Sequence, residues 1–317
     1  MAPTGINSKI LQQLQARVGK IHLRQRLGME RAYEHKVFGK GRTFFHIENW
    51  SSLRGLLRVL LGLSGLLGRS RRNARRIVVR HNHVPVSGLP AGFDNFTLLQ
   101  ITDLHMDMAQ DYPQVLARVV RELEYDVCVL TGDYRAETFG PWQPAVDGLR
   151  EVRGSLREEV YAVLGNHDTL AMLPDIEAMG IRVLMNEQVS IERGGERIYL
   201  AGVDDAHYFR ADNLEKAADA IPDGSISILL SHTPEIYRPA AHADFRLMLC
   251  GHTHGGQLCL PGGFALVKNA DCRRLFCAGA WHYHGMAGYT SVGSGTCVAD
   301  VRLNCPPEVV LHHLHPC

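Results

Sequence analysis

The sequence predicts an α/β sandwich, with buried strands in the middle and helices outside. Two features of the 317 residues predict it. From residue 77 onward, short apolar runs alternate with stretches in which apolar residues recur at helical spacing. Most of these runs are followed at once by a cluster of polar residues, as expected where active-site loops leave strand ends. A hydrophobic content of 45% is enough to bury a large core.

The first 76 residues are predicted to form a separate basic arm. Residues 1–80 contain 17 Lys and Arg but 3 Asp and Glu, whereas the remainder contains 17 and 30. A basic segment of this kind is attracted to anionic surfaces such as membrane headgroups or nucleic acid. We therefore divide the chain into a basic helical arm, residues 1–76, and an acidic domain, residues 77–317.

Within the arm, residues 1–50 are predicted to form one or two surface helices, and residues 51–69 an amphipathic helix. In the second segment, arginines and glycines recur along one stripe, leucines cover the other side, and more arginines follow. This composition is typical of a helix lying in a bilayer interface. The alternative is a helix packed on its own domain or on a second subunit.

The predicted location is the cytoplasm, at the cytoplasmic face of the membrane. The sequence has no uncharged apolar run of about 18 residues, so a spanning helix is not expected. The amino terminus lacks a signal-peptide pattern. The eight cysteines contain no Cys-x-x-Cys pair, which favours a reducing compartment.

The elements of the acidic domain follow from the alternating patterns. Strands are predicted at 77–80, 96–102, 126–131, 159–164, 225–230 and 245–249, with three more within 181–203 and short ones between 256 and 311. Helices are predicted at 113–124, which starts with a proline, and at 142–153, 170–179 and 213–220. Residues 85–92 are expected to be a loop, and the late histidines His312, His313 and His315 a surface tail.

Five polar clusters supply the donors of a candidate metal site. They are Asp103-Leu104-His105, Gly132-Asp133, Gly165-Asn166-His167-Asp168, Ser231-His232 and Gly251-His252-Thr253-His254. Three clusters begin with glycine, which suits a backbone that turns sharply off a strand. Oxygen and imidazole donors without a thiolate suit manganese, iron, zinc or cobalt. The candidate metal ligands are Asp103, His105, Asp133, Asn166, His232, His252 and His254.

Three neighbouring side chains are predicted to act without binding metal. His167 is the candidate catalytic residue, because it could protonate a leaving oxygen or stabilise charge on a phosphoryl group. Asp168 is expected to cap a loop or support a ligand. Arg135 is expected either to contact a substrate phosphate or to be a surface charge.

The order of the five clusters resembles that of the calcineurin-like metallophosphoesterases, over roughly residues 77–314. The resemblance implies a four-layer α/β/β/α sandwich and two divalent metal ions, of which we expect manganese first, with iron or zinc as alternatives. It implies that Asp133 bridges the two ions and that His167 contacts the phosphate. The first ion would be held by Asp103, His105, Asp133 and His254, and the second by Asp133, Asn166, His232 and His252.

Further residues resemble the YkuE/YaeI-type branch of this family, namely 251–261 and Pro306-Pro307-Glu308. Members of that branch commonly carry an amino-terminal membrane segment, and its relatives include pyrophosphatases that cleave UDP-2,3-diacylglucosamine in lipid A synthesis. Arg54 and Arg58 interrupt the expected membrane anchor. Tyr134-Arg135-Ala136 lacks the acid that orients the catalytic histidine of phosphoprotein phosphatases, so the partner of His167 is unassigned and a protein-phosphatase role loses support.

Three functions are therefore compared. The first is a metal-dependent hydrolase that cleaves a phosphoester or pyrophosphate of a lipid-linked substrate, with residues 51–76 on an anionic membrane surface. The second is a soluble phosphodiesterase acting on nucleotides or nucleic acid, and the third is a non-enzymatic scaffold. The leucines of residues 51–69 favour the first, because nucleic acid gains little from an apolar face. The complete donor set disfavours the third. No specific nucleic-acid partner is predicted, and the oligomeric state is left open.

Overall fold

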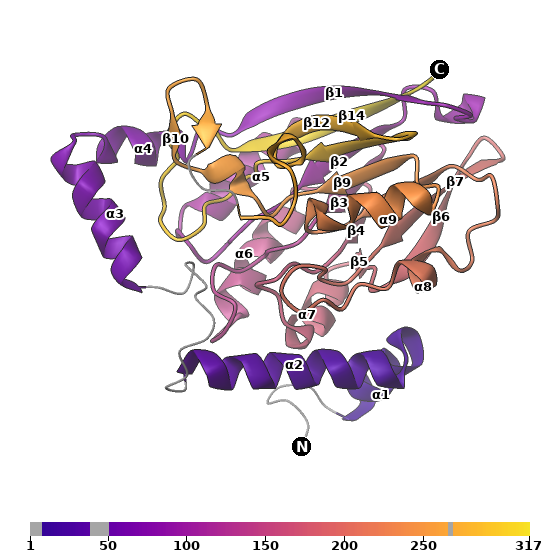
Figure 1. The fold of residues 1–317 in the computed structure, drawn as a ribbon, viewed down its shortest axis with the longest axis horizontal. Coiled ribbons are helices and arrows are strands. Elements are labelled where there is room, and N and C mark those ends of the chain that lie inside the picture. The colour runs from indigo at the N-terminus through magenta and orange to yellow at the C-terminus, as the bar shows by residue number, and fades with distance from the viewer. Residues whose placement is uncertain (1–7, 39–50, 266–268) are drawn as a thin grey trace.

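Two six-stranded sheets pack face to face at the centre of the molecule (Figure 1). The computed structural model describes residues 8–38, 51–265 and 269–317. The first sheet has the order β1-β14-β2-β3-β4-β5 and consists of β1 (Val78–Val86), β2 (Thr97–Ile101), β3 (Val127–Leu130), β4 (Glu159–Ala162), β5 (Ile181–Val183) and β14 (Glu308–Pro316). The second has the order β12-β13-β9-β8-β7-β6 and consists of β6 (Glu187–Arg193), β7 (Glu196–Gly202), β8 (Ser227–Leu230), β9 (Leu247–Cys250), β12 (Gly279–Tyr283) and β13 (Met286–Thr290).

Alternate residues of the central strands face two different cores. In β2, Leu98 packs between the sheets, whereas Leu99 packs against the helices outside the first sheet. In β3, Val129 and Cys128 divide in the same way, and all four side chains are fully buried. Successive side chains of a strand point to opposite faces, so strands covered on both sides are apolar throughout. This explains the continuous apolar runs of the sequence.

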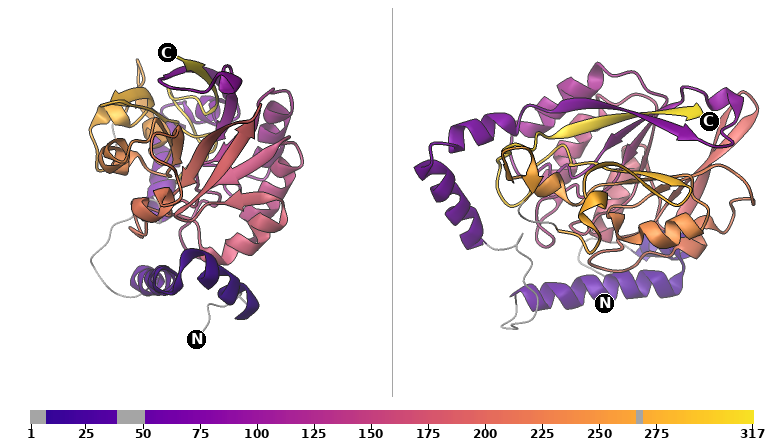
Figure 2. Two further views of the ribbon diagram at one scale, coloured as in Figure 1. Left: turned by 90° about the vertical axis from the view of Figure 1, so that its right-hand side faces the viewer. Right: turned by 45° about the horizontal axis from the view of Figure 1, so that its top comes forward.

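Helices cover the outer face of each sheet, as the side view in Figure 2 shows. The first sheet is covered by α5 (Tyr112–Arg121), α6 (Gln143–Arg153) and α7 (Leu173–Ala178). The second is covered by α8 (Leu214–Ala218) and α9 (Tyr237–His242), the latter absent from the sequence-based prediction. Short 3₁₀ turns complete the fold at 91–93, 170–172, 234–236, 254–256 and 274–276. The predicted four-layer α/β/β/α sandwich is confirmed.

The expectations for the two ends of the acidic domain were wrong. Strand β1 continues through Pro85, which was expected in a loop. Because β1 is an edge strand, the missing N–H of proline is tolerated there. The expected histidine tail is part of β14, which pairs with β1 on one side and β2 on the other. His312 is fully buried, with Nε2 2.9 Å from Oε1 of Gln100, and His313 stacks on His81.

The first half of the predicted arm packs on the body of the protein. Residues 8–38 form two helices, α1 (Ser8–Val18) and α2 (Lys20–Phe38), while 1–7 and 39–50 lie outside the described residues. Leu14 and Val18 join the core that lies outside the first sheet. Arg17 forms ion pairs with Glu177 at 2.7 Å and Glu187 at 2.8 Å. These contacts attach α1 to the body, and the division at residue 76 stays a prediction.

The second half of the arm is a pair of helices, not the single helix expected over 51–69. Helix α3 (Ser51–Leu63) and helix α4 (Leu67–Asn73) are separated by a turn in which Gly65 has a φ of 71°. Leu61 anchors α3 by packing with Ala299 and Val301. No helix among the described residues is both long and apolar enough to cross a membrane.

Candidate metal centre

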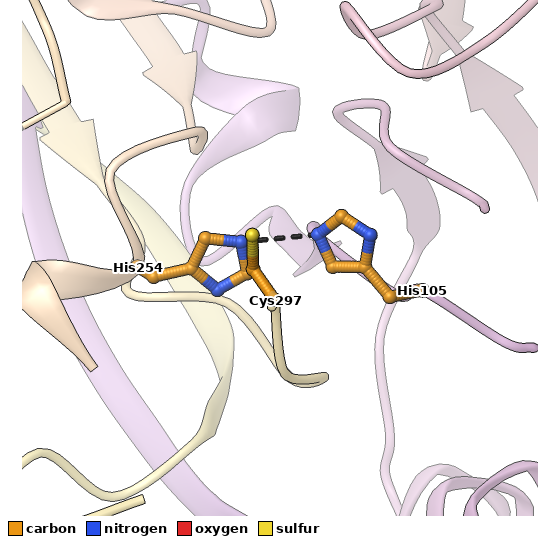
Figure 3. A group of neighbouring side chains, drawn as sticks. All are labelled: His105, His254 and Cys297. Carbon is orange, nitrogen blue, oxygen red and sulfur yellow. Dashed lines mark hydrogen bonds between the residues drawn. The ribbon is translucent and has the colours of Figure 1, made fainter. Parts of the chain in front are cut away.

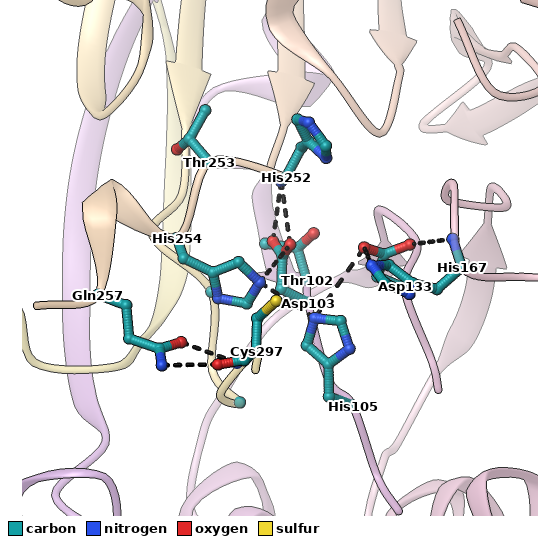
Figure 4. Close-up of polar contacts among 12 residues, drawn as sticks. Thr102, Asp103, His105, Asp133, His167, His252, Thr253, His254, Gln257 and Cys297 are labelled. Atoms are coloured by element: carbon teal, nitrogen blue, oxygen red, sulfur yellow. Dashed lines mark hydrogen bonds and ion pairs between the residues drawn. The ribbon is translucent and has the colours of Figure 1, made fainter. Parts of the chain in front are cut away.

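The predicted donor residues come together at the carboxyl ends of five strands. Strands β2, β3 and β4 of the first sheet and β8 and β9 of the second are each followed by one polar cluster. Figure 4 shows Asp103, His105, Asp133 and His254, from three of these clusters, close together. Loops at this end of parallel strands are the usual place for active sites. All eight predicted site residues lie in this one buried cluster, with exposed fractions of at most 7%.

The backbone of the cluster is held in an unusual conformation. Five predicted ligands have left-handed φ angles, and none is glycine: Asp103 (51°), His105 (42°), Asp133 (58°), His252 (73°) and His254 (50°). Such residues cost about 1–3 kcal/mol each and persist where surrounding contacts over-determine them. Here the loops hold each other, because Asp103 N donates to Gly132 O at 3.0 Å and His105 N to Asp133 O at 3.0 Å.

Glycines leave room for the two carboxylates. A Cβ on Gly165 would collide with Oδ1 of Asp133, and one on Gly251 with Oδ2 of Asp103 and Oγ1 of Thr102. Of the three glycines that begin a cluster, Gly132 alone has the positive φ, 94°, that a sharp turn off a strand was expected to require. For Gly165 and Gly251 the physical reason is therefore close approach of a side chain, not a sharp turn.

One donor group surrounds His232. Its Nε2 lies 3.1 Å from Oδ2 of Asp133, 3.1 Å from Oδ1 of Asn166 and 3.3 Å from Nδ1 of His252. The potential ligand atoms of Asp133, His232 and His252 lie within 4.8 Å of one another, a spacing that could hold a metal ion.

A second donor group lies beside the first. Nε2 of His254 is 3.3 Å from Oδ1 of Asp103 and 3.0 Å from Nε2 of His105. Asp103, His105 and Asp133 form a further set of ligand atoms within 4.8 Å. Asp133 therefore belongs to both groups, the position expected of a bridging ligand.

Backbone carbonyls orient two of the imidazoles. Nδ1 of His105 lies 2.7 Å from the carbonyl of Arg135, and Nδ1 of His232 lies 2.8 Å from that of Thr131. Because a carbonyl only accepts hydrogen bonds, each Nδ1–H donates and Nε2 faces the cluster. Histidines that ligate metals are commonly held in this way.

The electrostatics of the cluster suit cation binding. Burial lowers the pKa of His105 to about 4 and is the main reason that the pKa of His254 lies well below its usual value. Both imidazoles are therefore neutral near pH 7, the form that binds metals. Burial would raise the pKa of Asp133, but His232 and His167 hold it well below its usual range. Burial would lower the pKa of His232, but the charge of Asp133 raises it to about 10, so this imidazole must lose a proton before it can bind a metal. His105 and His254 thus supply neutral nitrogens beside the charged carboxylate of Asp133, which fits divalent transition metals.

His167 faces the same cluster from its outer side. Its Nε2 lies 3.8 Å from Oδ2 of Asp133, and its backbone N donates to Oδ1 at 2.9 Å. Its Nδ1 lies 3.2 Å from Oγ1 of Thr138, which supplies the partner that sequence reasoning left unassigned. An acid was expected next to Asp133, whereas a hydroxyl five residues along contacts His167.

Asp168 and Arg135 support the loops. Asp168 accepts backbone N–H groups of Asp133 at 2.8 Å, Tyr134 at 2.9 Å and Gly165 at 2.8 Å, so the expected loop-capping role is confirmed. Arg135 is 4% exposed and donates to the carbonyls of His167, Thr138 and Gly140. The expectation of a surface charge was therefore wrong, whereas contact with a substrate phosphate stays a prediction, because Arg135 also lines a cavity at this end of the site.

One residue at the centre was missed altogether. Cys297 lies with His105 and His254 in a third set of potential ligand atoms within 4.8 Å (Figure 3). It follows strand β13 through Gly293-Ser294-Gly295, a strand end with glycines like the other clusters. Its position after a strand end could have pointed to the site, but residues 291–297 contain no His, Asp or Asn that would mark them as a polar cluster.

Comparisons with known proteins agree with this arrangement. Residues 96–256 match the family described as calcineurin-like phosphoesterase. The uncharacterized metallophosphoesterase YkoQ of Bacillus subtilis (strain 168) is 28% identical over 237 residues, which are 72% of this chain and 86% of YkoQ. The phosphodiesterase YaeI of Escherichia coli (strain K12) is 26% identical over 235 residues, 69% of this chain and 82% of YaeI.

A longer relative also matches. A transmembrane protein with metallophosphoesterase domain from Bos taurus is 31% identical over 258 residues, 73% of this chain but 57% of the cattle protein. The present chain thus spans little more than half of that relative. The family match itself covers just over half of the 317 residues and includes all five polar clusters. The chain therefore belongs to the calcineurin-like phosphoesterases and is a metallophosphoesterase, a hydrolase.

Proposed function

We propose that the protein is a dinuclear metal-dependent hydrolase that cleaves a phosphodiester or pyrophosphate of a lipid-linked substrate at the cytoplasmic face of a membrane. The observation that carries the dinuclear centre is the place of Asp133 in two donor groups. When bound, two divalent ions polarise the phosphoryl group and activate a water molecule. We assign Asp103, His105, Asp133 and His254 to one ion, and Asp133, Asn166, His232 and His252 to the other.

In this proposal His167 handles the proton of the leaving group. Its ring is 2% exposed, and the contact of Nδ1 with Thr138 leaves Nε2 on the side of Asp133. Protonated there, it can donate to the leaving oxygen as the bond to phosphorus breaks. The interaction between Nδ1 and the hydroxyl of Thr138 restricts rotation of the ring.

A cavity of about 330 Å³ offers space for the substrate next to the residues that adjoin His167. Thr138, which contacts His167, and Asp168, which follows it in the chain, line this cavity, and Leu27 and Arg31 line it from α2. This volume is at the lower end of ligand pockets, which span about 300–1,000 Å³. It suits a headgroup, and the lipid chains would remain outside.

Helix α3 supports the membrane part of the proposal. Four apolar side chains of this helix are more than half exposed: Leu56 (54%), Val59 (57%), Leu60 (53%) and Leu63 (84%). Leu260 and Phe264 of the β10–β11 hairpin (Cys259–Leu260 and Phe264–Ala265) are also exposed, at the same end of the molecule (Figures 1 and 2). Arg58, Arg69 and Arg71 are exposed beside them. An apolar face next to arginines fits an anionic bilayer interface.

The experiment that tests the proposal is a substrate panel with manganese or zinc added. The panel contains an aryl phosphodiester, a nucleoside pyrophosphate, a phosphoprotein and UDP-2,3-diacylglucosamine in anionic vesicles. We expect turnover to be highest on the nucleotide lipid and to depend on the vesicles. Equal turnover of soluble nucleotides or nucleic acid without vesicles would instead support the soluble phosphodiesterase. No turnover with any metal would contradict both.

A further inference from the structure

The loop after β13 brings a cysteine to the proposed metal centre. Ser294 N donates to the carbonyl of Thr102 at 3.0 Å, and Gly295 N to that of Asp103 at 2.9 Å. A Cβ on Gly295 would collide with the carbonyl of Leu104. This loop is therefore fastened directly to the segment that carries Asp103.

The side chain of Gln257 fixes the backbone of Cys297 (Figure 4). Cys297 N donates to Oε1 of Gln257 at 2.7 Å, while Nε2 of Gln257 donates to the carbonyl of Cys297 at 2.8 Å and of Ala299 at 3.0 Å. Gln257 closely follows His254, so one side chain ties the two loops together. These bonds fix the backbone of Cys297 beside the His254 loop.

Buried Arg302 adds a second tie between the same loops. Its guanidinium donates to the carbonyls of His254 at 3.0 Å and Val292 at 2.8 Å. It is fully buried, and so these bonds are protected from water. His254 and the Cys297 loop are thus held as one unit.

The thiol faces the two imidazoles that the proposal gives to the first metal ion. Sγ of Cys297 and the ring nitrogens of His105 and His254 lie within 4.8 Å of one another, with the two Nε2 atoms 3.0 Å apart. Figure 3 shows the sulfur beside the facing nitrogens of both rings. Ligands of one zinc ion lie about 2.0–2.3 Å from it, so donors spaced in this way can share an ion after small shifts.

We propose that Cys297 is an additional ligand of the first metal ion, as a thiolate, and makes that position prefer zinc or iron over manganese. The inference rests on the proposed dinuclear centre. On binding, the S–H bond breaks heterolytically, the sulfur electron pair forms the bond to the metal, and the proton leaves to water, with no redox change. Thiolates select softer ions, whereas manganese prefers oxygen donors. The second group, with Asn166, His232 and His252, contains no sulfur.

Cobalt substitution tests the inference directly. Full-length protein is stripped with chelator and loaded with Co²⁺, and its absorption is recorded beside that of Cys297→Ser and Cys305→Ser. Cys305 is the matched control, because its Sγ bonds the carbonyl of His254 and lies outside the three donor groups. We expect a near-ultraviolet sulfur-to-cobalt charge-transfer band in the wild type and in Cys305→Ser, and its loss in Cys297→Ser.

Metal competition supplies the second readout. Loss of even an outer-shell partner typically weakens metal binding about 10–100-fold, so the Zn²⁺-to-Mn²⁺ affinity ratio should fall at least about tenfold in Cys297→Ser. Two bound cobalt ions without the band, or an unchanged ratio, would overturn the role of Cys297 while leaving the dinuclear centre intact. Failure of the wild type to bind two ions would overturn both proposals. Circular dichroism of each variant establishes that it is folded.

Discussion

The carboxylate of Asp133 and the imidazole of His167 are neighbours with different tasks. Asp133 is shared by the two donor groups, whereas His167 contacts Asp133 from outside and lies in none of the three sets. A substitution of Asp133 should therefore lower the metal content, whereas a substitution of His167 should lower turnover alone.

Replacing Asp133 by Asn should remove both metal ions and abolish turnover. The amide keeps the shape but loses the charge that a bridging ligand supplies to two cations. Metal content by mass spectrometry and turnover of an aryl phosphodiester measure this. Asp147→Asn, at an exposed carboxylate paired with Arg150, is the control and should retain both metals. Two retained ions with full turnover in Asp133→Asn would refute the bridge.

His167→Ala should keep its metals but lose about 10²–10⁴ in turnover, the range for a positioned general acid. The loss should shrink for aryl esters with acidic leaving groups, which need no protonation. Thr138→Ala should show a smaller loss with the same dependence, because the ring remains but is no longer oriented, whereas Thr138→Ser should be near normal. If all leaving groups suffer equally, His167 stabilises charge and is not the acid.

Among the elements, α2 connects the amino-terminal region to the centre. Its Arg26 is fully buried, bonds to Oδ1 of Asp204 at 3.3 Å and Oε1 of Glu30 at 2.7 Å, and lies over the ring of Phe209. It also donates to the carbonyl of Asp168 at 2.9 Å. Asp168 caps the loops of Asp133 and Gly165, so α2 supports the proposed metal centre as well as the substrate cavity.

Arg26→Ala should destabilise the protein by about 3–5 kcal/mol, because it breaks the buried ion pair with Asp204 and leaves only His22 beside that charge. The pKa of Asp204 is lowered: burial would raise it, but Arg26 and His22 outweigh burial. The stabilisation is therefore present near neutral pH and is lost as the pH falls through the depressed value. Urea unfolding at neutral and acidic pH measures it, with exposed Arg24→Ala as control. Equal stability of the two variants would contradict the coupling.

Helix α3 is the element on which the proposed membrane attachment depends. Leu60→Gln combined with Leu63→Gln should release the protein from anionic vesicles but leave turnover of a soluble ester unchanged. The matched control is Ile21→Gln, because Ile21 is 66% exposed but lies on α2, apart from α3 in Figure 1. Added salt should weaken binding of the wild type, since each Lys or Arg near an anionic leaflet contributes about 1 kcal/mol. The membrane proposal would be contradicted if the wild type did not bind vesicles, or if the double variant lost only self-association. Either result would identify α3 as a protein-binding surface.

For the whole molecule, the proposed metal ions should cross-link the two sheets, because their ligands follow strand ends of both sheets. Ligand at 100 times its dissociation constant stabilises the folded state by about 2.7 kcal/mol. Chelator treatment should therefore lower Tm, and zinc or manganese should restore it. Calorimetry of the wild type and of Asp133→Asn checks this, and the variant should show little metal-dependent change. An identical Tm with and without metal would contradict this cross-linking by metal ions.

Local patterns in the sequence predicted most of the strands, the polar clusters that come together in one buried place and the capping role of Asp168, because each depends on short-range alternation or on a motif. Distant pairings were not predictable in this way. Arg17 and Arg26 resemble solvated charges until Glu177 and Asp204, from remote segments, pack against them. Cys297 belongs to no motif and reaches the centre only because its loop is fastened to that of Asp103. Gly65 ended the predicted long helix by a backbone angle that periodicity does not show.

The position of β14 in the first sheet has a consequence for biosynthesis. This strand, residues Glu308–Pro316, lies between β1 and β2, although the ribosome makes it after every other strand of the sheet. Its first residue also holds the Cys297 loop, since Glu308 N donates to Gly293 O at 3.0 Å and Oε1 of Glu308 accepts from Val292 N at 3.2 Å. Until this strand emerges, β1 and β2 of a nascent chain lack the strand that pairs with both, and the Cys297 loop lacks its hydrogen bonds to Glu308. The proposed centre can therefore mature only after residues 308–316 have emerged and paired with β1 and β2.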